Sequence, residues 1–227
     1  MSLQKKTARH ATTKEPLTTL LDVVAAKSVS PEGWYKVTPT DDCTFEFYSH
    51  GKGRFQRARI RGKLEQDVMR ELNNRVSKGM HVWDVGAAWG YFTQAIVSMG
   101  ASVTAFEIDS DRCDIISEAA ERNGWKDRVT AIDGAVGDDI VLDNYPSPDV
   151  VKMDIEGWEY EAIKGARETL SAGPTWIVEV HEPEITSDGI PARPGERMES
   201  LFQEHGYNVT YLKERSATNY HIVAEKI

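Results

Sequence analysis

From residue 81 onward, short apolar segments alternate with longer amphipathic ones, and this alternation constrains the fold more than any other feature. We predict strands at about residues 81–85, 102–107, 128–132, 149–153 and 175–180. We predict helices between or after them, at about residues 90–99, 111–123, 158–171 and 195–205. Strands that alternate with helices are typical of a parallel sheet covered by helices on both faces.

Two further apolar segments, YNVTYLK and NYHIVAEKI, end the chain with only a short polar loop between them. So short a connection cannot cross over between parallel strands, so we expect these two strands to pair antiparallel. The predicted fold class is therefore α/β, with a mostly parallel sheet that closes in a C-terminal antiparallel hairpin.

Residues 1–63 precede this pattern, and we predict that they form a small extension before a domain of residues 64–227. The extension would contain a loose start, an amphipathic helix with Leu17, Leu20 and Val24 on one face, and an antiparallel ribbon over residues 34–60. The segment LEQDVMRELNNRV then predicts a helix that leads into the first strand.

Charge separates along the chain at nearly the same place. Residues 1–80 hold 15 Lys and Arg against 9 Asp and Glu, whereas residues 81–227 hold 12 against 27. Within the basic part, residues 52–63 have no acid, and Arg57, Arg59 and Arg61 would share one face of a strand. Such a face could attract an anionic acceptor or could protect an edge strand from aggregation.

Composition also limits the cellular setting. No apolar run approaches the roughly 18 residues that a membrane span needs, and the basic N-terminus lacks the apolar core of a secretory signal. Cys43 and Cys113 are far apart and have no metal-type spacing, so we predict free, buried or idle thiols. We therefore expect a cytoplasmic protein without a membrane span.

The first predicted strand passes into the first helix through the glycine-containing loop of HVWDVGAAWGYF. In an open α/β sheet, ligands bind at the carboxyl ends of the strands, where Gly86 and Gly90 would let the backbone turn and approach a ligand. A dinucleotide loop requires G-x-G-x-x-G, but Ala88 and Tyr91 occupy the second and third glycine positions. The loop disfavours a nicotinamide cofactor and leaves open a turn that serves packing alone.

Acidic residues follow the next two predicted strands. Glu107 lies 23 residues after Asp84, where an acid commonly binds ribose hydroxyls, although it could be an ordinary acid at a strand end. Asp133 could accept from an adenine amino group, with a backbone N–H near Ala135 beside it, or could form an Asx turn before Gly134. Loop, strand and acids together predict a nucleoside-bearing cofactor.

Five segments, in order along the chain, resemble the FkbM-type family of S-adenosylmethionine (SAM)-dependent methyltransferases: DVGAAWGYFT, FEID, DGAVGDD, KMDIEGWEYEAIKGA and IVEVHEP. The resemblance covers about residues 64–227 and rests chiefly on D-I-E-G-x-E followed by K-G-A. It implies a Rossmann-like class I methyltransferase sheet, SAM as the cofactor, and O-methylation of a hydroxyl on a small molecule, sugar or glycolipid.

By position, the resemblance also implies which residues bind the cofactor. Asp154, at the end of the fourth predicted strand, would lie beside the reactive methyl group. Ala88 stands where the family usually has asparagine, so one amide contact to the cofactor is absent here. The implied cofactor-binding residues are Asp84, Gly86, Ala88, Gly90, Glu107, Ile108, Asp133, Ala135 and Asp154.

Methyl transfer to oxygen requires alignment of the reactants and removal of the hydroxyl proton, for which Asp154, Glu156 and His181 are the candidate catalytic residues. His181 titrates in the useful range and is the preferred base, although it could be a structural hydrogen-bonding residue. Glu156 either faces the site or caps the following helix. Asp154, Glu179 and His181 could instead hold Mg²⁺, but their spacing does not demand a metal and we predict none.

Two other functions remain as alternatives. An RNA or other nucleic-acid methyltransferase would use the basic segment, but the domain is acidic and lacks the N/D-P-P-Y/F string after the fourth strand. A non-catalytic SAM- or nucleotide-binding module should have lost the acids of the fourth and fifth strands, which are present. We expect a small-molecule or glycan acceptor, which the basic segment could attract if it is anionic, and a loop over the site near residues 184–197.

Overall fold

The computed structural model describes residues 31–51, 53–182, 194–214, 216 and 218–227. The amphipathic helix predicted near residues 17–24 and most of the loop predicted over the site lie outside the described residues. None of the described helices is both long enough and apolar enough to cross a membrane.

The centre of the molecule is a seven-stranded sheet in the order β5-β4-β3-β6-β7-β9-β8. The first five strands in this order run parallel, β9 pairs antiparallel with β7, and β8 pairs antiparallel with β9. This confirms the predicted parallel sheet and terminal hairpin. The strands are β3 (His81–Val85), β4 (Ser102–Glu107), β5 (Val129–Asp133), β6 (Val150–Met153), β7 (Thr175–His181), β8 (Tyr207–Glu214) and β9 (Asn219–Lys226).

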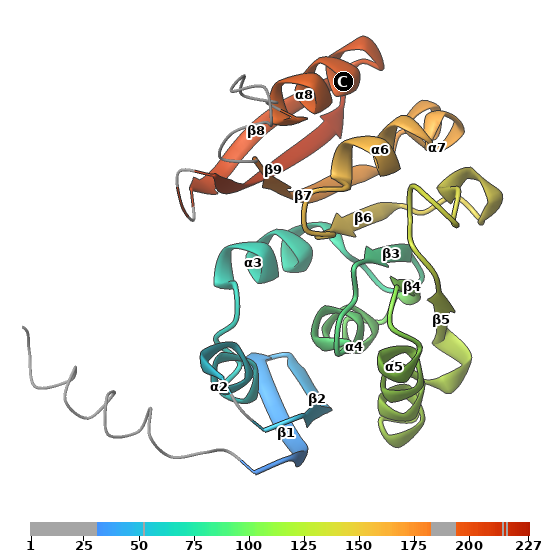
Figure 1. Cartoon of the computed structure of the whole chain (residues 1–227). Helices are drawn as coiled ribbons and strands as arrows, with labels where there is room; N and C mark the ends of the chain where they lie inside the picture. Colours follow the sequence, from blue (N-terminus) through green and yellow to red (C-terminus); the bar gives the residue numbers. More distant parts are fainter. Residues whose placement is uncertain (1–30, 52, 183–193, 215, 217) are drawn as a thin grey trace, which may run out of the picture.

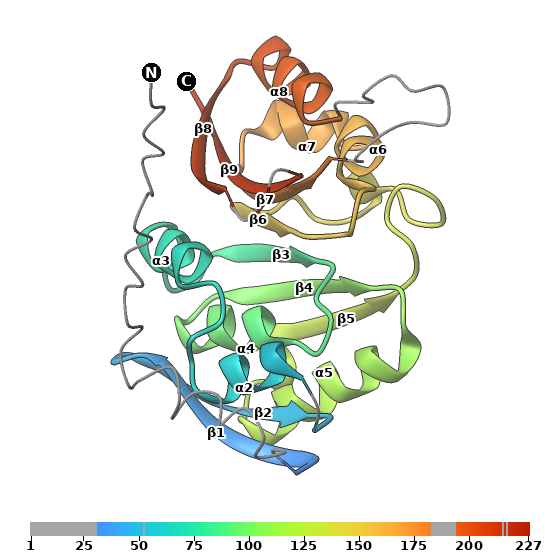
Figure 2. The same ribbon diagram turned by 60° about the vertical axis from the view of Figure 1, so that its left-hand side comes forward.

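Helices cover both faces of the sheet (Figures 1 and 2). One apolar core lies between the sheet and the helices α3 (Gln66–Arg75), α4 (Tyr91–Ser98) and α5 (Ser110–Arg122). The other lies between the sheet and α6 (Glu159–Lys164), α7 (Arg167–Ala172) and α8 (Pro194–Glu204). Central strands buried on both faces read as continuous apolar runs, which explains why their positions could be predicted.

The N-terminal part contributes a two-stranded antiparallel ribbon, β1 (Gly33–Thr40) with β2 (Cys43–Ser49). The ribbon packs on α4, where Phe45 and Phe47 contact the ring of Tyr91 edge-on at centroid distances of 5.7 Å and 5.8 Å. Phe45 and Phe47 belong to the same apolar core as α3 and α4. Cys43 and Cys113 are buried free thiols, as predicted.

The prediction for the segment RFQRARI was wrong. It alternates apolar and charged residues like a strand, but it forms the helix α2 (Arg54–Ile60). The reason is that β1 and β2 already pair with each other, and arginine and alanine favour a helix where no strand partner is available. Residues two apart on a helix point about 200° apart, so Arg57 and Arg59 do not share a face.

The predicted helix over residues 158–171 is also divided. Gly165 and Ala166 end α6 and begin α7, with Gly165 as the C-cap of the first helix. Glycine within a helix costs about 1 kcal/mol relative to alanine, so the K-G-A string marks the break.

Candidate active site

The loops that follow β3 and β6 meet at the centre of the sheet and form the start of the candidate site. The chain runs from β3 outward to β4 and β5 and then returns to β6 on the other side of β3, so the loops after β3 and β6 flank the point where the strand order reverses. Gly86 follows β3 with φ 79°, and a Cβ atom there would overlap with the carbonyl oxygen of Asp154. Glycine therefore lets these two loops lie against each other.

A cavity of about 420 Å³ opens at this point, within the size range of pockets that hold a small ligand. Its walls come from the ends of β3, β4, β5 and β6 and from α2. Six of the nine residues predicted to bind the cofactor line it, namely Gly86, Ala88, Glu107, Ile108, Ala135 and Asp154.

Glu107 is the acid at the end of β4, and its side chain is 4% exposed. One carboxylate oxygen accepts the backbone N–H of Ala88 at 2.7 Å, and the other accepts the N–H of Asp109 at 3.2 Å and pairs with Arg112 at 3.2 Å. These contacts fix the carboxylate against the cavity. Ile108 beside it lines the cavity and is 69% exposed. An exposed apolar side chain in a cavity offers a surface on which a flat apolar ring can pack.

Three of the predicted cofactor-binding residues do not line the cavity. Asp84 is fully buried, where it accepts the Thr93 hydroxyl at 2.6 Å and pairs with the Lys152 ammonium at 3.3 Å. Gly90 is the N-cap of α4 and packs closely on Ile116. Asp133 is exposed outside the lining.

The cavity lining also includes residues that the sequence reasoning missed. Asp138, in the loop after β5, takes a place in the lining where Asp133 was expected. Arg59, Arg112 and the half-exposed Trp158 also line the cavity. The glycine loop pattern could not indicate them, because they come from α2, α5 and the loop before α6.

Backbone strain is concentrated at the site. In the described part of the chain, three residues other than glycine have positive φ: Glu65 at 38°, Ala88 at 50° and Glu156 at 54°. Ala88 and Glu156 line the large cavity, and Glu65 lines a small cavity on the other side of Asp154. Such conformations cost of order 1–3 kcal/mol each and are found mainly at functional sites.

Asp154 directly follows β6 and lines both cavities. Its Oδ1 atom has no hydrogen-bond partner among the described residues. Burial is the main cause that raises the pKa of Asp154 to about 6. The positive charge of Lys152 lowers this pKa, but the negative charges of Glu179 and Glu65 oppose that effect. The carboxylate is thus ionised at neutral pH and takes up a proton at a moderately acidic pH.

His181, at the end of β7, lies among four carboxylates and outside the lining of the large cavity. Its Nδ1 bonds to Glu159 at 2.9 Å, and its Nε2 lies 3.5 Å from Glu156, 3.7 Å from Glu179 and 3.9 Å from Asp154. Burial lowers the pKa of His181, but the hydrogen bond to Glu159 and the surrounding negative charges outweigh it and raise this pKa to about 9. His181 is therefore a cation at neutral pH.

Glu159, rather than Glu156, holds the loop before α6. Its side chain is 2% exposed, and Oε1 accepts the backbone N–H groups of Ile155 at 3.3 Å and Gly157 at 3.1 Å as well as His181. Glu156 is 86% exposed and lines the cavity, so its alternative role as a helix cap is not found. The string D-I-E-G-W-E does not show which of its acids turns inward, because positive φ at Glu156 and Gly157 redirects the chain.

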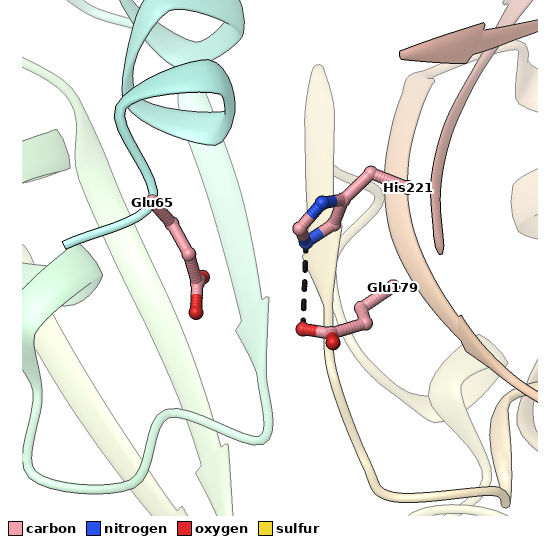
Figure 3. Close-up of side chains that lie close together, drawn as sticks. All are labelled: Glu65, Glu179 and His221. Atoms are coloured by element: carbon pink, nitrogen blue, oxygen red, sulfur yellow. Dashed lines mark ion pairs between the residues drawn. The ribbon is translucent and has the colours of Figure 1, made fainter. Parts of the chain in front are cut away.

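Figure 3 shows a second group of titratable residues, Glu65, Glu179 and His221. They line the small cavity that Asp154 also lines. Glu65 comes from the start of α3, Glu179 from β7 and His221 from β9. His221 places Nε2 3.4 Å from Glu179 and Nδ1 3.5 Å from Asp67. The buried ammonium of Lys152 lines the same small cavity and supplies positive charge to it.

Among the described residues, two groups of side chains have the composition of a cation site: Asp154 with Glu156 and His181, and Glu65 with Glu179 and His221. In the first group His181 carries a positive charge at neutral pH and already pairs with the surrounding carboxylates. The second group has Lys152 beside it. We retain the prediction that no metal is used.

The cavity fits SAM. It combines a buried carboxylate at the end of β4, an exposed apolar side chain next to it and a backbone turn that approaches the ligand closely at Gly86. These are the features that ribose hydroxyls, an adenine ring and a methionine tail require. Glu107 would hold the ribose, Ile108 would contact the adenine, and Gly86 and Ala88 would border the methionine part.

The sheet order with its antiparallel end, together with this cavity, defines a Rossmann-like SAM-dependent methyltransferase. The profile of the methyltransferase FkbM domain matches residues 71–209. The chain belongs to the FkbM methyltransferase family, whose methyl donor is SAM.

Relatives and solved structures agree with this class. The chain is 31% identical over 150 residues to the hexuronic acid methyltransferase AglP of Haloferax volcanii, which covers 52% of this chain and 62% of that protein. It resembles the M. jannaschii TYW2 structure in complex with AdoMet (TM-score 0.54, 21% identity, 87% of this chain and 88% of that chain). It also resembles precorrin-6y C5,15-methyltransferase from Geobacter metallireducens GS-15 (TM-score 0.53, 18% identity, 72% and 90%). At these identities the two solved structures establish the fold alone.

Proposed function

We propose that the protein transfers the methyl group of SAM to a hydroxyl oxygen of a sugar. The similarity to a hexuronic acid methyltransferase supports a sugar, and within that class a uronic acid, as the acceptor. Because the matched segment spans less than two thirds of that relative, the acceptor is part of the proposal.

The observation that carries the reaction type is the state of Asp154. Its carboxylate lies at the switch point of the sheet and lines the cofactor cavity, and its Oδ1 atom has no hydrogen-bond partner among the described residues, with His181 Nε2 3.9 Å away. A hydroxyl acceptor must lose its proton, and a base is most effective when its pKa lies near the working pH. With a pKa of about 6, Asp154 is ionised at neutral pH and retains more basicity than an ordinary aspartate.

In the proposed mechanism, bound SAM supplies an electrophilic methyl group on a good leaving group. The carboxylate of Asp154 would accept the proton of the acceptor hydroxyl, while bound SAM would supply the methyl group and leave as S-adenosylhomocysteine. Glu107 and the loop at Gly86 hold the cofactor in position, so that positioning and proton removal are the contributions of the protein.

His181 has a different role in this proposal from the one that the sequence suggested. A histidine with a pKa of about 9 holds its proton at neutral pH and is not available as the base. We assign it, together with Glu159, to positioning: Glu159 binds both the imidazole and the loop of Ile155 and Gly157 that follows Asp154.

The proposal is tested by incubating the protein with methyl-labelled SAM and a panel of uronic acids, neutral sugars and RNA. We expect label in a sugar as a methyl ether, with S-adenosylhomocysteine formed in equal amount. Label recovered only in RNA would overturn the acceptor class, and a methyl ester on a uronic acid would overturn the role of Asp154, because a carboxylate acceptor has no proton to remove.

A further inference from the structure

A second cavity, of about 310 Å³, lies next to the cofactor cavity. It is formed between α2, the end of the ribbon and the loop after β3, and we call it the α2 groove. Arg59, Ala88 and Arg112 line both cavities, so the two spaces share a wall. The α2 groove is further lined by His50, Gly53, Phe55, Gln56 and Trp89.

Three side chains that line the α2 groove, those of Gln56, Arg59 and Arg112, have a buried polar atom without a hydrogen-bond partner among the described residues, but Arg112 Nε still pairs with Asp109 at 3.3 Å. Gln56 is 2% exposed, yet its Oε1 atom has no hydrogen-bond partner among the described residues. The same holds for the buried Nε atom of Arg59, and in the described part of the chain no carboxylate lies within ion-pair distance of Arg59. Buried polar atoms of native proteins are nearly always hydrogen-bonded, and a ligand in the groove can supply the partners that these two atoms lack.

The charge of Arg59 points to an anion. Burial lowers the pKa of Arg59, and the attraction of Glu65 and Asp154 only partly opposes this effect. A guanidinium ion stays protonated in proteins, so the partly buried Arg59 offers a positive charge to an anionic ligand in the groove. Its planar fork matches the two oxygens of a carboxylate better than it matches a point charge.

The other lining residues restrict what carries this anion. The Oε1 atom of Gln56 accepts hydrogen bonds and so requires a donor, such as a hydroxyl, on the ligand. Phe55 is 44% exposed at the α2 groove, and Trp89 stacks on His50 with ring centroids 4.5 Å apart. Aromatic faces of this kind pack against the C–H face of a sugar ring. A ligand with a carboxylate, hydroxyls and an apolar ring face satisfies all of these groups together.

We propose that the α2 groove is the acceptor subsite and that it binds a uronic acid, with the carboxylate on Arg59 and a hydroxyl on Gln56. This inference rests on the proposed sugar methylation and adds the part of the acceptor that is recognised. It also assigns a role to the basic segment of residues 52–63, because Arg59 of this segment lines both the cofactor cavity and the α2 groove. Arg57, on the same helix, is not among the groove-lining residues.

The test compares two probes that differ only in the carboxylate, methyl β-D-glucuronide and methyl β-D-glucoside. Their binding is measured by ligand-observed NMR titration of the full chain saturated with S-adenosylhomocysteine, so the result does not depend on turnover. We expect the glucuronide to bind at least about tenfold more tightly, which corresponds to about 1.4 kcal/mol. Equal affinity for the two probes in the unaltered protein would overturn the inference without any variant.

Variants then assign the preference to Arg59. Arg59→Gln should remove the glucuronide preference and leave the affinity for S-adenosylhomocysteine within about threefold, whereas the matched control Arg57→Gln should change neither. An Arg59→Gln protein that keeps the preference, or that loses cofactor affinity as strongly as glucuronide affinity, would overturn the inference. Methyl transfer is measured separately: glucuronide binding without transfer would contradict the proposed function and leave the carboxylate site standing.

Discussion

The carbonyl oxygen of Asp154 occupies the space that a side chain on Gly86 would need. The loops after β3 and β6 therefore touch at the switch point, and this contact positions both Asp154 and the cavity beside it. We predict that Gly86→Ala separates the loops and destabilises the fold by roughly 2–5 kcal/mol, from the positive φ and the overlap together.

The control for Gly86→Ala is Gly124→Ala. Gly124 has a similar φ of 73°, but a Cβ atom there would meet open space, so the expected cost is about 1–2 kcal/mol. Urea denaturation of both variants and calorimetric SAM binding measure the two effects. Equal costs in the two variants, with normal SAM affinity, would show that the close approach at Asp154 is unimportant.

Glu107→Gln should weaken SAM binding by about tenfold or more, because the neutral amide accepts hydrogen bonds from ribose hydroxyls less strongly than a carboxylate does. Isothermal titration calorimetry measures the change directly. Glu121→Gln, an exposed acid on α5 that pairs with Lys126, is the control and should bind SAM normally. Normal affinity in Glu107→Gln would count against the ribose assignment.

Asp154→Asn should reduce kcat by about 10²–10⁴-fold while changing SAM affinity little, because the amide occupies the same space but cannot accept the proton. In the unaltered protein, activity should rise with pH through about 6 and level off above it, since the carboxylate is active when ionised. Asp138→Asn alters another carboxyl group of the cavity, and its activity should still rise with pH through about 6. A rate independent of pH between 5 and 8 would contradict the assignment of Asp154.

His181 should make the stability of the protein fall in alkaline solution. Its folded-state pKa of about 9 exceeds the pKa of 6.5 of an unperturbed histidine, so its contribution is fully present below about pH 6.5 and is lost as the pH rises through about 9. The loss is on the order of 3 kcal/mol. Unfolding free energies at pH 7 and pH 10 should differ by less in His181→Gln than in the unaltered protein, and the same decline in both would refute the pairing. His205→Gln, outside the carboxylate cluster, is the control.

The sheet could be predicted from the sequence because its central strands are buried on both faces and are bounded by glycine-containing turns. The helix α2 could not, because RFQRARI fits both a strand and a helix locally. Its state depends on β2, which already has a partner in β1. That Arg59 lines both cavities could be seen only once this segment was known to form the helix α2.

Part of the site was also predictable. Glu107 and Asp154 end strands, so their place at the carboxyl edge follows from the topology. By contrast, Glu65 and His221 are more than 150 residues apart in the chain and meet only because β9 is inserted beside β7. The raised pKa of His181 could not be predicted either, because it depends on the inward orientation of Glu159, which the sequence does not show.

The most direct test of the account is the position of the transferred methyl group on a uronic acid. With methyl-¹³C SAM and methyl β-D-glucuronide, NMR and mass spectrometry of the product should show one labelled methyl ether on a ring hydroxyl, and Asp154→Asn should give almost none. A labelled methyl ester, or a labelled ether formed at an undiminished rate by Asp154→Asn, would contradict the claim that Asp154 removes a hydroxyl proton.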